Sequence, residues 1–421
     1  MSSQHFFVTE HTSPCQHIRE YPHGVLRENE TLELAVKEYR PRNGPSEDED
    51  AVTIIAGHGN GFPKECYEAL WDELLLRSKP FKIRSIWFAD IANQGASYAK
   101  NADKLGDDPN WFDHSRDLLL MINNFRDRIV SPVVGIAHSM GCSQIVGLSL
   151  IHPRLFHSLV LIEPIILERH PPGPNAAFFT SLRRETWPNR AKASAQLSKN
   201  PFFKTMDPRA LTAYVTHALR DLPDGSGVTL ATPKAQEAWT YARMNVNAQP
   251  DDLSRHTPEA RARERLLQPD LEPYNETAVK VFNRPESAVA VRELPRVRPR
   301  ALFLYGERTE INLENVRELH KARMGVGPGG SGGVVEGNVK QKVLEGVGHL
   351  VPFERPGLVA EEAAGWLTVE MERWKQEKRF WDTIDTKKSS DGRKKLSEHW
   401  LKSVKDDPMM DRPKAKNVVK L

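Results

Sequence analysis

Cysteine is scarce in this sequence, which holds only Cys15, Cys66 and Cys142 among 421 residues. The number is odd and the spacing is wide, so the cysteines predict neither a disulfide framework nor a CxxC metal site. A reducing compartment fits this composition best.

Long apolar runs are also missing. No stretch approaches the roughly 20 residues that a helix needs to cross a bilayer, so we expect no integral membrane span. The first residues lack the basic start and the apolar centre of a secretory signal. The net charge is only +3 and the basic excess lies near the C-terminal end, which argues against a nucleic-acid partner. What remains is a chain long enough to bury a sizeable core, with 39% hydrophobic residues.

Short apolar, β-branched segments recur along the chain, as is typical of strands that are covered on both faces. They are residues 51–56, 83–89, 133–137, 159–163, 301–305 and 342–344. Helix-like segments lie between several of them, so we predict an α/β fold with a mostly parallel central sheet. Residues 16–21 and 32–39 alternate apolar with polar and predict an opening antiparallel β-hairpin.

The pattern changes after residue 163, where helix-like segments with loops replace the buried strands. These segments are residues 176–185, 190–197, 208–220 and 233–244. An insertion at this place predicts a helical cap over the carboxyl edge of the sheet, where open α/β sheets bind their ligands. We therefore divide the chain into a core (16–163 and 297–368), a helical cap (164–296), and a charged helix with a basic tail (369–421), to which we assign no chemistry.

The strongest motif is the segment 133–143, in which a buried strand leads through a small-x-Ser-x-Gly turn into a helix. Such a turn lifts the serine above the sheet, and it requires small residues two before and two after. Ala137 and Gly141 meet that need, so Ser139 is the predicted nucleophile. The N–H of Met140, at the start of the helix, is a predicted oxyanion donor.

A second oxyanion donor is predicted in the loop after the first buried strand, which reads His58-Gly59-Asn60-Gly61. Glycines on both sides of Asn60 let its N–H point toward a bound carbonyl. His58 is a possible general base, but we favour a role in which its hydrogen bonds hold the loop.

Ser139 needs a base, because a serine hydroxyl is a poor nucleophile at neutral pH. His349 follows the last predicted strand. In sites built on such a serine turn, the nucleophile, the acid and the histidine follow one another along the chain, so the histidine is expected at this place. The expected Gly-x-x-Asp loop after residue 305 instead has Thr309 in the carboxylate position. We favour Glu163, at the end of its strand, as the acid and keep Glu310 as the alternative; a structural role for Glu163 also stays open. No metal and no organic cofactor is required by this chemistry.

Several further motifs resemble those of a known group, the α/β-hydrolase-fold proteins of filamentous fungi, similar to toxin-biosynthesis hydrolases and to a yeast peroxisomal lipase. The resemblance runs from about residue 16 to about residue 366 and implies an esterase, lipase or thioesterase activity. It rests on residues 58–65, 90–98, 113–117, the turn at Ser139, Glu163-Pro164, Arg183-Arg184, Trp187-Pro188, 207–209 and Gly348-His349.

These features predict a serine hydrolase that cleaves an ester or acyl thioester of an apolar small molecule. The apolar substrate is inferred from aromatic residues of the predicted cap, which could equally form its own core: Phe178, Phe179, Trp187, Phe202, Phe203 and Trp239. Arg183 and Arg184 could meet an acid or a coenzyme A phosphate, or lie on a solvated helix face. Two alternatives stay open: a carbon–carbon hydrolase or lyase on the same residues, and a non-catalytic binding protein, suggested by the missing Gly-x-x-Asp.

The last three residues, Val419, Lys420 and Leu421, keep two positions of the peroxisomal Ser-Lys-Leu signal and lack its small first residue. Many members of the resembling group end in such a signal. We therefore expect recognition by a peroxisomal import receptor, and otherwise a cytoplasmic location.

Overall fold

The computed structural model of this chain describes residues 2–44, 48–169, 175–244, 257–267, 270, 281–385, 389, 391–407 and 409. The chain separates into two compact units, residues 1–371 and 372–421. The second unit contains the end of α13 (Pro356–Asp385), the 3₁₀ turn η7 (Asp391–Arg393) and helix α14 (Glu398–Asp406). Over the described ranges, no helix combines the length and the apolar character needed to cross a bilayer.

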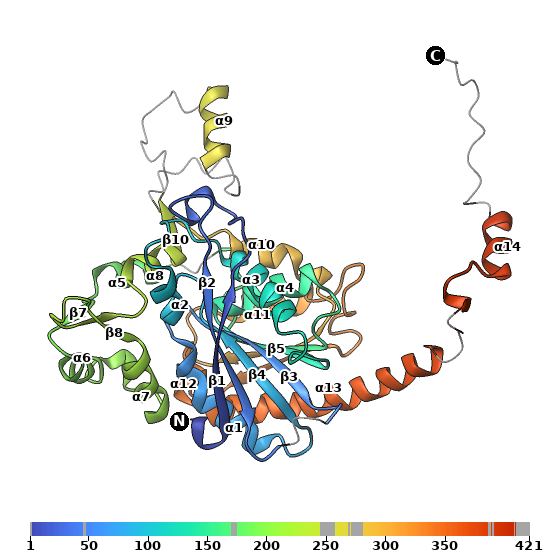
Figure 1. Cartoon of the computed structure of the whole chain (residues 1–421), viewed down its shortest axis with the longest axis horizontal. Coiled ribbons are helices and arrows are strands. Elements are labelled where there is room, and N and C mark those ends of the chain that lie inside the picture. Colours follow the sequence, from blue (N-terminus) through green and yellow to red (C-terminus); the bar gives the residue numbers. More distant parts are fainter. Residues whose placement is uncertain are drawn as a thin grey trace. The chain divides into compact units, whose positions relative to one another are not determined.

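An eight-stranded sheet forms the centre of the first unit, in the order β1-β2-β4-β3-β5-β6-β12-β13 (Figure 1). Neighbouring strands from β4 to β13 run parallel, whereas β2 is antiparallel to both β4 and β1. The predicted mostly parallel sheet with an antiparallel start is therefore confirmed. The strands are β1 (Phe6–Pro14), β2 (Glu33–Pro41), β3 (Val52–Gly57), β4 (Ile83–Ala89), β5 (Val133–His138), β6 (Ser158–Ile162), β12 (Arg300–Gly306) and β13 (Val339–Leu344).

The first strand was predicted in the wrong place. β1 pairs with β2 from Phe6 to Pro14, so the sheet begins before residue 16, where we expected the core to start. Residues 16–21 form no strand, because their polar groups bind helix α3 (Trp111–Asn124) instead. Arg19 forms ion pairs with Asp113 and Asp117. The Arg19 side chain is only 7% exposed. The polar residues in the alternating pattern of residues 16–21 therefore do not mark the solvent-facing side of a strand.

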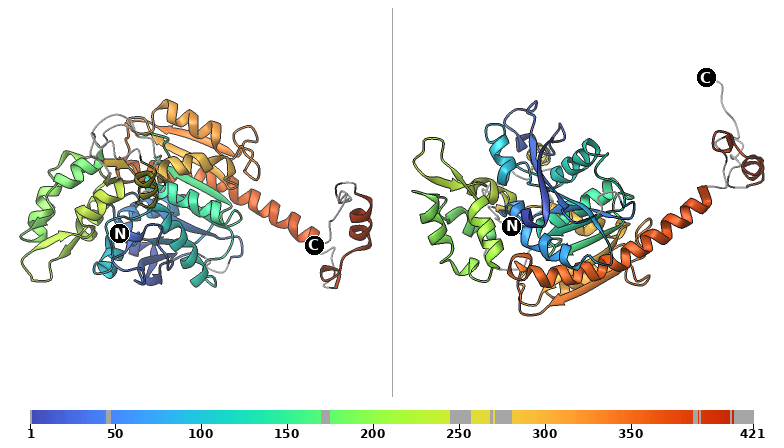
Figure 2. Two further views of the ribbon diagram at one scale, coloured as in Figure 1. Left: turned by 90° about the horizontal axis from the view of Figure 1, so that it is seen from above. Right: turned by 60° about the horizontal axis from the view of Figure 1, so that its bottom comes forward.

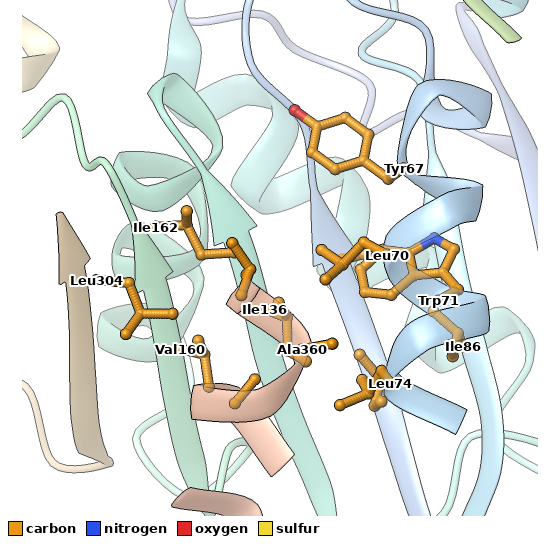
Figure 3. Close-up of a cluster of buried hydrophobic side chains, with 14 of the residues drawn as sticks. Tyr67, Leu70, Trp71, Leu74, Ile86, Ile136, Val160, Ile162, Leu304 and Ala360 are labelled. Atoms are coloured by element: carbon orange, nitrogen blue, oxygen red, sulfur yellow. The ribbon is translucent and has the colours of Figure 1, made fainter. Parts of the chain in front are cut away.

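Helices cover both faces of the sheet, and each face has its own apolar cluster. Along β5, Val134 and Ile136 belong to one cluster, while Val133 and Ala137 belong to the other. This two-residue alternation is what the pleat of a strand dictates. Figure 3 shows the first cluster, in which Trp71 and other side chains of α1 lie near the sheet.

The helices of the two faces are listed by cluster. The first cluster contains residues of α1 (Glu68–Arg77), α7 (Pro208–His217), α12 (Val351–Glu354) and α13; the second contains residues of α3, α4 (Met140–Ile151) and α10 (Glu286–Glu293), with α2 (Gly95–Asn101) and α11 (Glu314–Arg323) packed against it. Single 3₁₀ turns lie at η1 (Ser2–Gln4), η2 (Pro22–Gly24), η3 (Lys64–Tyr67), η4 (Pro201–Phe203) and η6 (Leu294–Arg296).

The part of the chain between β6 and β12 that runs from α5 (Ala176–Leu182) to α7, drawn in green, lies at one side of the sheet in both views of Figure 2, whereas α10 packs on a face of the sheet. The further helices between β6 and β12 are α6 (Arg190–Leu197), α8 (Lys234–Tyr241) and α9 (Pro258–Leu267). The insertion also contains short strands that the sequence did not predict: the sheet β7 (Thr186–Trp187), β9 (Val228–Leu230) and β8 (Leu219–Asp221), and the pair β10 (Ala242–Met244) and β11 (Val281–Asn283). The insertion is thus not purely helical.

The division of the chain into core, cap and tail stays a prediction. Helix α13 runs without a break across the predicted boundary between residues 368 and 369.

Candidate functional site

Ser139 occupies a sharp turn between β5 and α4. Its backbone has φ 57° and ψ −123°, a conformation that L-residues rarely adopt and that costs on the order of 1–3 kcal/mol. Three backbone hydrogen bonds hold the turn: Ser139 N–H donates to the Ile162 carbonyl at 2.9 Å, and the Ser139 carbonyl accepts from Ile165 N–H and from Cys142 N–H, each at 3.1 Å. The turn therefore presents the hydroxyl beyond the carboxyl end of β5.

The helix that follows Ser139 approaches β3 so closely that side chains are excluded. A Cβ on Gly141 would lie 2.6 Å from the carbonyl carbon of Gly57, and a Cβ on Gly57 would lie 3.1 Å from the Gly141 oxygen. Gly141 therefore has the steric role that its place in the motif predicted.

Ser139, His349 and Glu163 come from three separate segments and form one hydrogen-bonded chain. Ser139 Oγ lies 2.9 Å from His349 Nε2, and His349 Nδ1 lies 3.0 Å from Glu163 Oε2. An ionised carboxylate only accepts hydrogen bonds, so Nδ1 of the neutral ring carries the proton and Nε2 accepts from the serine hydroxyl. This tautomer is the one that can take a proton from Ser139.

Glu163 is fully buried and lies at positive φ, 46°, directly after β6. Its carboxylate accepts three further hydrogen bonds: from Gly306 N–H at 2.6 Å, from the Thr309 hydroxyl at 2.7 Å and from Asn312 Nδ2 at 2.9 Å. Burial raises the pKa of Glu163, but the hydrogen bonds and the nearby His349 outweigh burial and lower this pKa below its usual value. The carboxylate is therefore ionised at neutral pH.

Thr309 explains the missing aspartate of the loop after β12. Its hydroxyl donates to Glu163, so the loop supplies hydrogen-bond donors while the carboxylate comes from the end of β6. Glu310, the alternative acid, is exposed. The structure brings Glu163, not Glu310, to His349. No local pattern in the sequence marks Asn312, because its amide acts on a carboxylate far away along the chain.

Asn60 lies in a loop that packs directly against Ser139, since a Cβ on the preceding Gly59 would be 3.2 Å from Ser139 Cβ. The Asn60 side chain is engaged on both sides. Its Oδ1 accepts from Gln94 at 2.6 Å, and its Nδ2 donates to the Glu237 carbonyl at 3.0 Å. Among the described residues we find no acceptor for the backbone N–H of Asn60 or of Met140. Both remain predicted oxyanion donors.

His58 holds this loop rather than the serine. Its Nε2 accepts from Ile91 N–H at 3.0 Å, so Nδ1 carries the proton and donates to the Gly59 carbonyl at 2.9 Å. Burial lowers the pKa of this ring, which keeps it neutral. Both ring nitrogens are thus occupied, as we favoured over a role as the general base.

The insertion meets the site next to Asn60. Arg183 of the insertion forms an ion pair with Glu237, which also accepts a hydrogen bond from the Thr180 hydroxyl. Arg183 is thus paired within the insertion, although its side chain is still 31% exposed. The six aromatic residues predicted for the cap differ in burial. Trp187 and Phe203 are buried, Trp239 is partly buried, and Phe178, Phe179 and Phe202 are more than half exposed.

Known proteins that are similar to this chain are alpha/beta hydrolases and thioesterases. A sequence model described as the alpha/beta hydrolase family matches residues 54–362. The type I acyl-CoA thioesterase mpaH' of Penicillium brevicompactum is 40% identical over 97% of this chain and 97% of its own length. The type I acyl-CoA thioesterase mpaH of Penicillium roqueforti is 38% identical over the same shares. The solved structure of the peroxisomal alpha-beta-hydrolase Lpx1 of Saccharomyces cerevisiae superposes with a TM-score of 0.66 at 19% identity, covering 91% of this chain and 98% of that one.

Proposed function

Because this chain belongs to the alpha/beta hydrolase family, we propose that it hydrolyses an acyl-CoA thioester with Ser139 as nucleophile. The family and the fold confirm two sequence predictions, the α/β-hydrolase fold and a hydrolase enzyme, and they set aside the non-catalytic alternative. The thioester itself is inferred from relatives named acyl-CoA thioesterases that align over nearly the whole chain. The observation that carries the proposal is the hydrogen-bonded chain from Ser139 through His349 to Glu163.

In the proposed reaction, Ser139 Oγ attacks the thioester carbonyl while His349 Nε2 takes the hydroxyl proton. The carbonyl π electrons move onto oxygen and return as the carbon–sulfur bond breaks. His349 gives its proton to the departing sulfur, and free coenzyme A leaves. Water then attacks the acyl-serine with His349 again as base, so the carboxylic acid is released and Ser139 is restored.

The Glu163 carboxylate has two tasks in this scheme. It keeps the His349 proton on Nδ1, so that Nε2 faces Ser139, and its charge stabilises the imidazolium that forms as the serine attacks. Its buried position makes that charge effective, because the surroundings screen it less than water would.

The negative oxygen of the tetrahedral intermediate would be bound by the N–H groups of Asn60 and Met140. Met140 begins α4, and the N-terminal end of a helix favours negative charge. The loss of one such donor lowers kcat by about 10²–10³-fold in other acyl-transfer enzymes, so this pair would supply a large share of the catalysis.

Carbon–carbon hydrolysis or lyase chemistry on the same three residues is the second candidate, and no contact among the described residues of the site favours it. A panel of saturated acyl-CoA thioesters, their oxygen-ester counterparts and a carbon–carbon substrate separates the two. We expect release of the coenzyme A thiol, measured with a thiol reagent, and its loss after treatment with a fluorophosphonate. Turnover of the carbon–carbon substrate without thiol release from any thioester would contradict the thioesterase proposal.

We also propose a peroxisomal location, which the peroxisomal name of the yeast relative supports. The C-terminal Val419, Lys420 and Leu421, where an import receptor would bind, lie outside the described residues. A fluorescent protein fused to the N-terminal end should give a punctate pattern that coincides with a peroxisomal marker. Removal of the last three residues should disperse it; an unchanged pattern would reject this signal.

A further inference from the structure

Two glycine-containing loops must be held in register for the proposed reaction. One carries Asn60 between Gly59 and Gly61, and the other carries His349 directly after Gly348. Glycine leaves the backbone free to move, so contacts from neighbouring segments must fix both loops. The Asn60 loop must hold an N–H to within a few tenths of an ångström, and the His349 loop must keep Nε2 against Ser139.

A hydrogen-bonded chain through Tyr67 and His138 joins the two loops. Gly59 N–H donates to the Tyr67 hydroxyl oxygen at 2.8 Å, and the Tyr67 hydroxyl lies 2.8 Å from His138 Nδ1. His138 Nε2 in turn lies 2.9 Å from the backbone carbonyl oxygen of His349. The chain thus begins one residue before Asn60 and ends on the residue that carries the base.

The chemistry of the groups fixes the direction of every bond in this chain. The His349 carbonyl can only accept, so His138 Nε2 carries the proton and donates. Burial and the neighbouring His349 lower the pKa of His138 well below its usual value, so the ring is neutral and its Nδ1 accepts from the Tyr67 hydroxyl. The oxygen of Tyr67 is then left to accept from Gly59 N–H. All polar groups are satisfied in a single arrangement.

Burial makes this arrangement rigid. Tyr67 is 2% exposed and His138 is 1% exposed. The Phe353 ring, from the short helix that follows His349, packs against both, with ring centroids 4.7 Å from Tyr67 and 5.5 Å from His138. Neither polar side chain has water to replace a lost partner, so breaking one bond forces a rearrangement.

We propose that Tyr67 and His138 are positioning residues, which hold the Asn60 loop and the His349 loop at a fixed separation across Ser139. They touch neither substrate nor reacting atoms, and the inference rests on the proposed function. His138 directly precedes Ser139, and a Cβ on Gly59 would lie 3.1 Å from its ring, so the chain passes immediately behind the nucleophile.

The fold contains a matched control. Tyr305 lies 2.9 Å from His320 Nδ1, and His320 Nε2 lies 2.7 Å from the Ile166 carbonyl oxygen. This is the same tyrosine–histidine–carbonyl sequence, equally buried, but it ends on neither of the two loops. Tyr305→Phe therefore breaks a buried chain of the same kind while the hydrogen bonds from Tyr67 and His138 to the two loops stay in place.

The experiment compares wild type, Tyr67→Phe and Tyr305→Phe by kcat and KM on an acyl-CoA thioester, by the rate of fluorophosphonate labelling, and by thermal unfolding. We expect both variants to unfold at lower temperature. Only Tyr67→Phe should lose kcat and labelling rate, each by about 10- to 100-fold, while KM stays within about twofold. With His138→Phe also measured alone, the double variant Tyr67→Phe/His138→Phe should lose less than the product of the two single losses, because both substitutions break one chain.

Equal losses of kcat in Tyr67→Phe and Tyr305→Phe, or wild-type kcat and labelling in Tyr67→Phe, would overturn the inference while leaving the proposed function intact. Independent, multiplying losses in the double variant would also overturn it. An unreactive wild-type enzyme, with neither labelling nor thioester turnover, would instead remove the proposed function and the inference with it.

Discussion

Replacement of Ser139 by alanine is expected to lower kcat by about 10⁴-fold or more and to abolish labelling by a fluorophosphonate. The substitution removes the only atom proposed to form the acyl bond, and it leaves His349 facing a methyl group at the turn. Some rate above the uncatalysed reaction should persist, because the predicted oxyanion donors remain. Thiol release from an acyl-CoA thioester and mass spectrometry of the labelled protein measure both effects.

Ser149→Ala is the matched control for this substitution. Ser149 is a buried serine in α4, the helix that begins directly after Ser139. Its hydroxyl donates to the Val146 carbonyl at 2.7 Å. This variant should keep both labelling and turnover. Undiminished turnover in Ser139→Ala, with a folded protein, would mean that another residue performs the attack.

Replacement of Glu163 by glutamine is expected to lower kcat by about 10³–10⁴-fold. Donors from Gly306, Thr309, Asn312 and His349 converge on this carboxylate. A glutamine offers them a single oxygen and directs its own NH₂ at some of them. Without the carboxylate, nothing favours the His349 tautomer that carries the proton on Nδ1. No negative charge then stabilises the protonated ring either.

Glu310→Gln tests the alternative acid under the same assay. Glu310 is exposed, so its substitution should leave kcat within about twofold of wild type, as is usual for surface changes. The assignment fails if Glu163→Gln retains full turnover while Glu310→Gln loses it. Circular dichroism of both variants would separate a catalytic loss from unfolding.

The sequence predicted the sheet well where a strand is buried on both faces. β4 matches the predicted segment 83–89, and β5 differs from its prediction by one residue, because a short, β-branched apolar run is typical of such a strand. The prediction failed at β1, where only Phe6 and Ser13 are buried and a nearby alternating segment competed. The short strands β7, β8 and β9 of the insertion are two or three residues long, too short for any alternation to register.

For the site, the sequence predicted the residues that local patterns mark. Ser139 is marked by the motif of its turn, His349 by its position after the last predicted strand, and Glu163 by its position at the end of a strand. Thr309, Asn312 and Tyr67 act through contacts with residues far away in the chain, and no spacing in the sequence identifies such partners. In the sequence, Thr309 was noticeable only as a hydroxyl at a position where a carboxylate was expected. The structure explains it, because the Thr309 hydroxyl donates to Glu163.

The position of Glu163 has one more consequence. Ser139 and Glu163 leave the ends of adjacent parallel strands, β5 and β6, which are paired up to His138 and Ile162. One contiguous β–α–β unit therefore supplies both the proposed nucleophile and the proposed acid, and it is complete before the insertion starts. We expect the insertion to be free to change in length or shape among relatives, altering which acyl groups are admitted, while the geometry between these two strand ends stays constant.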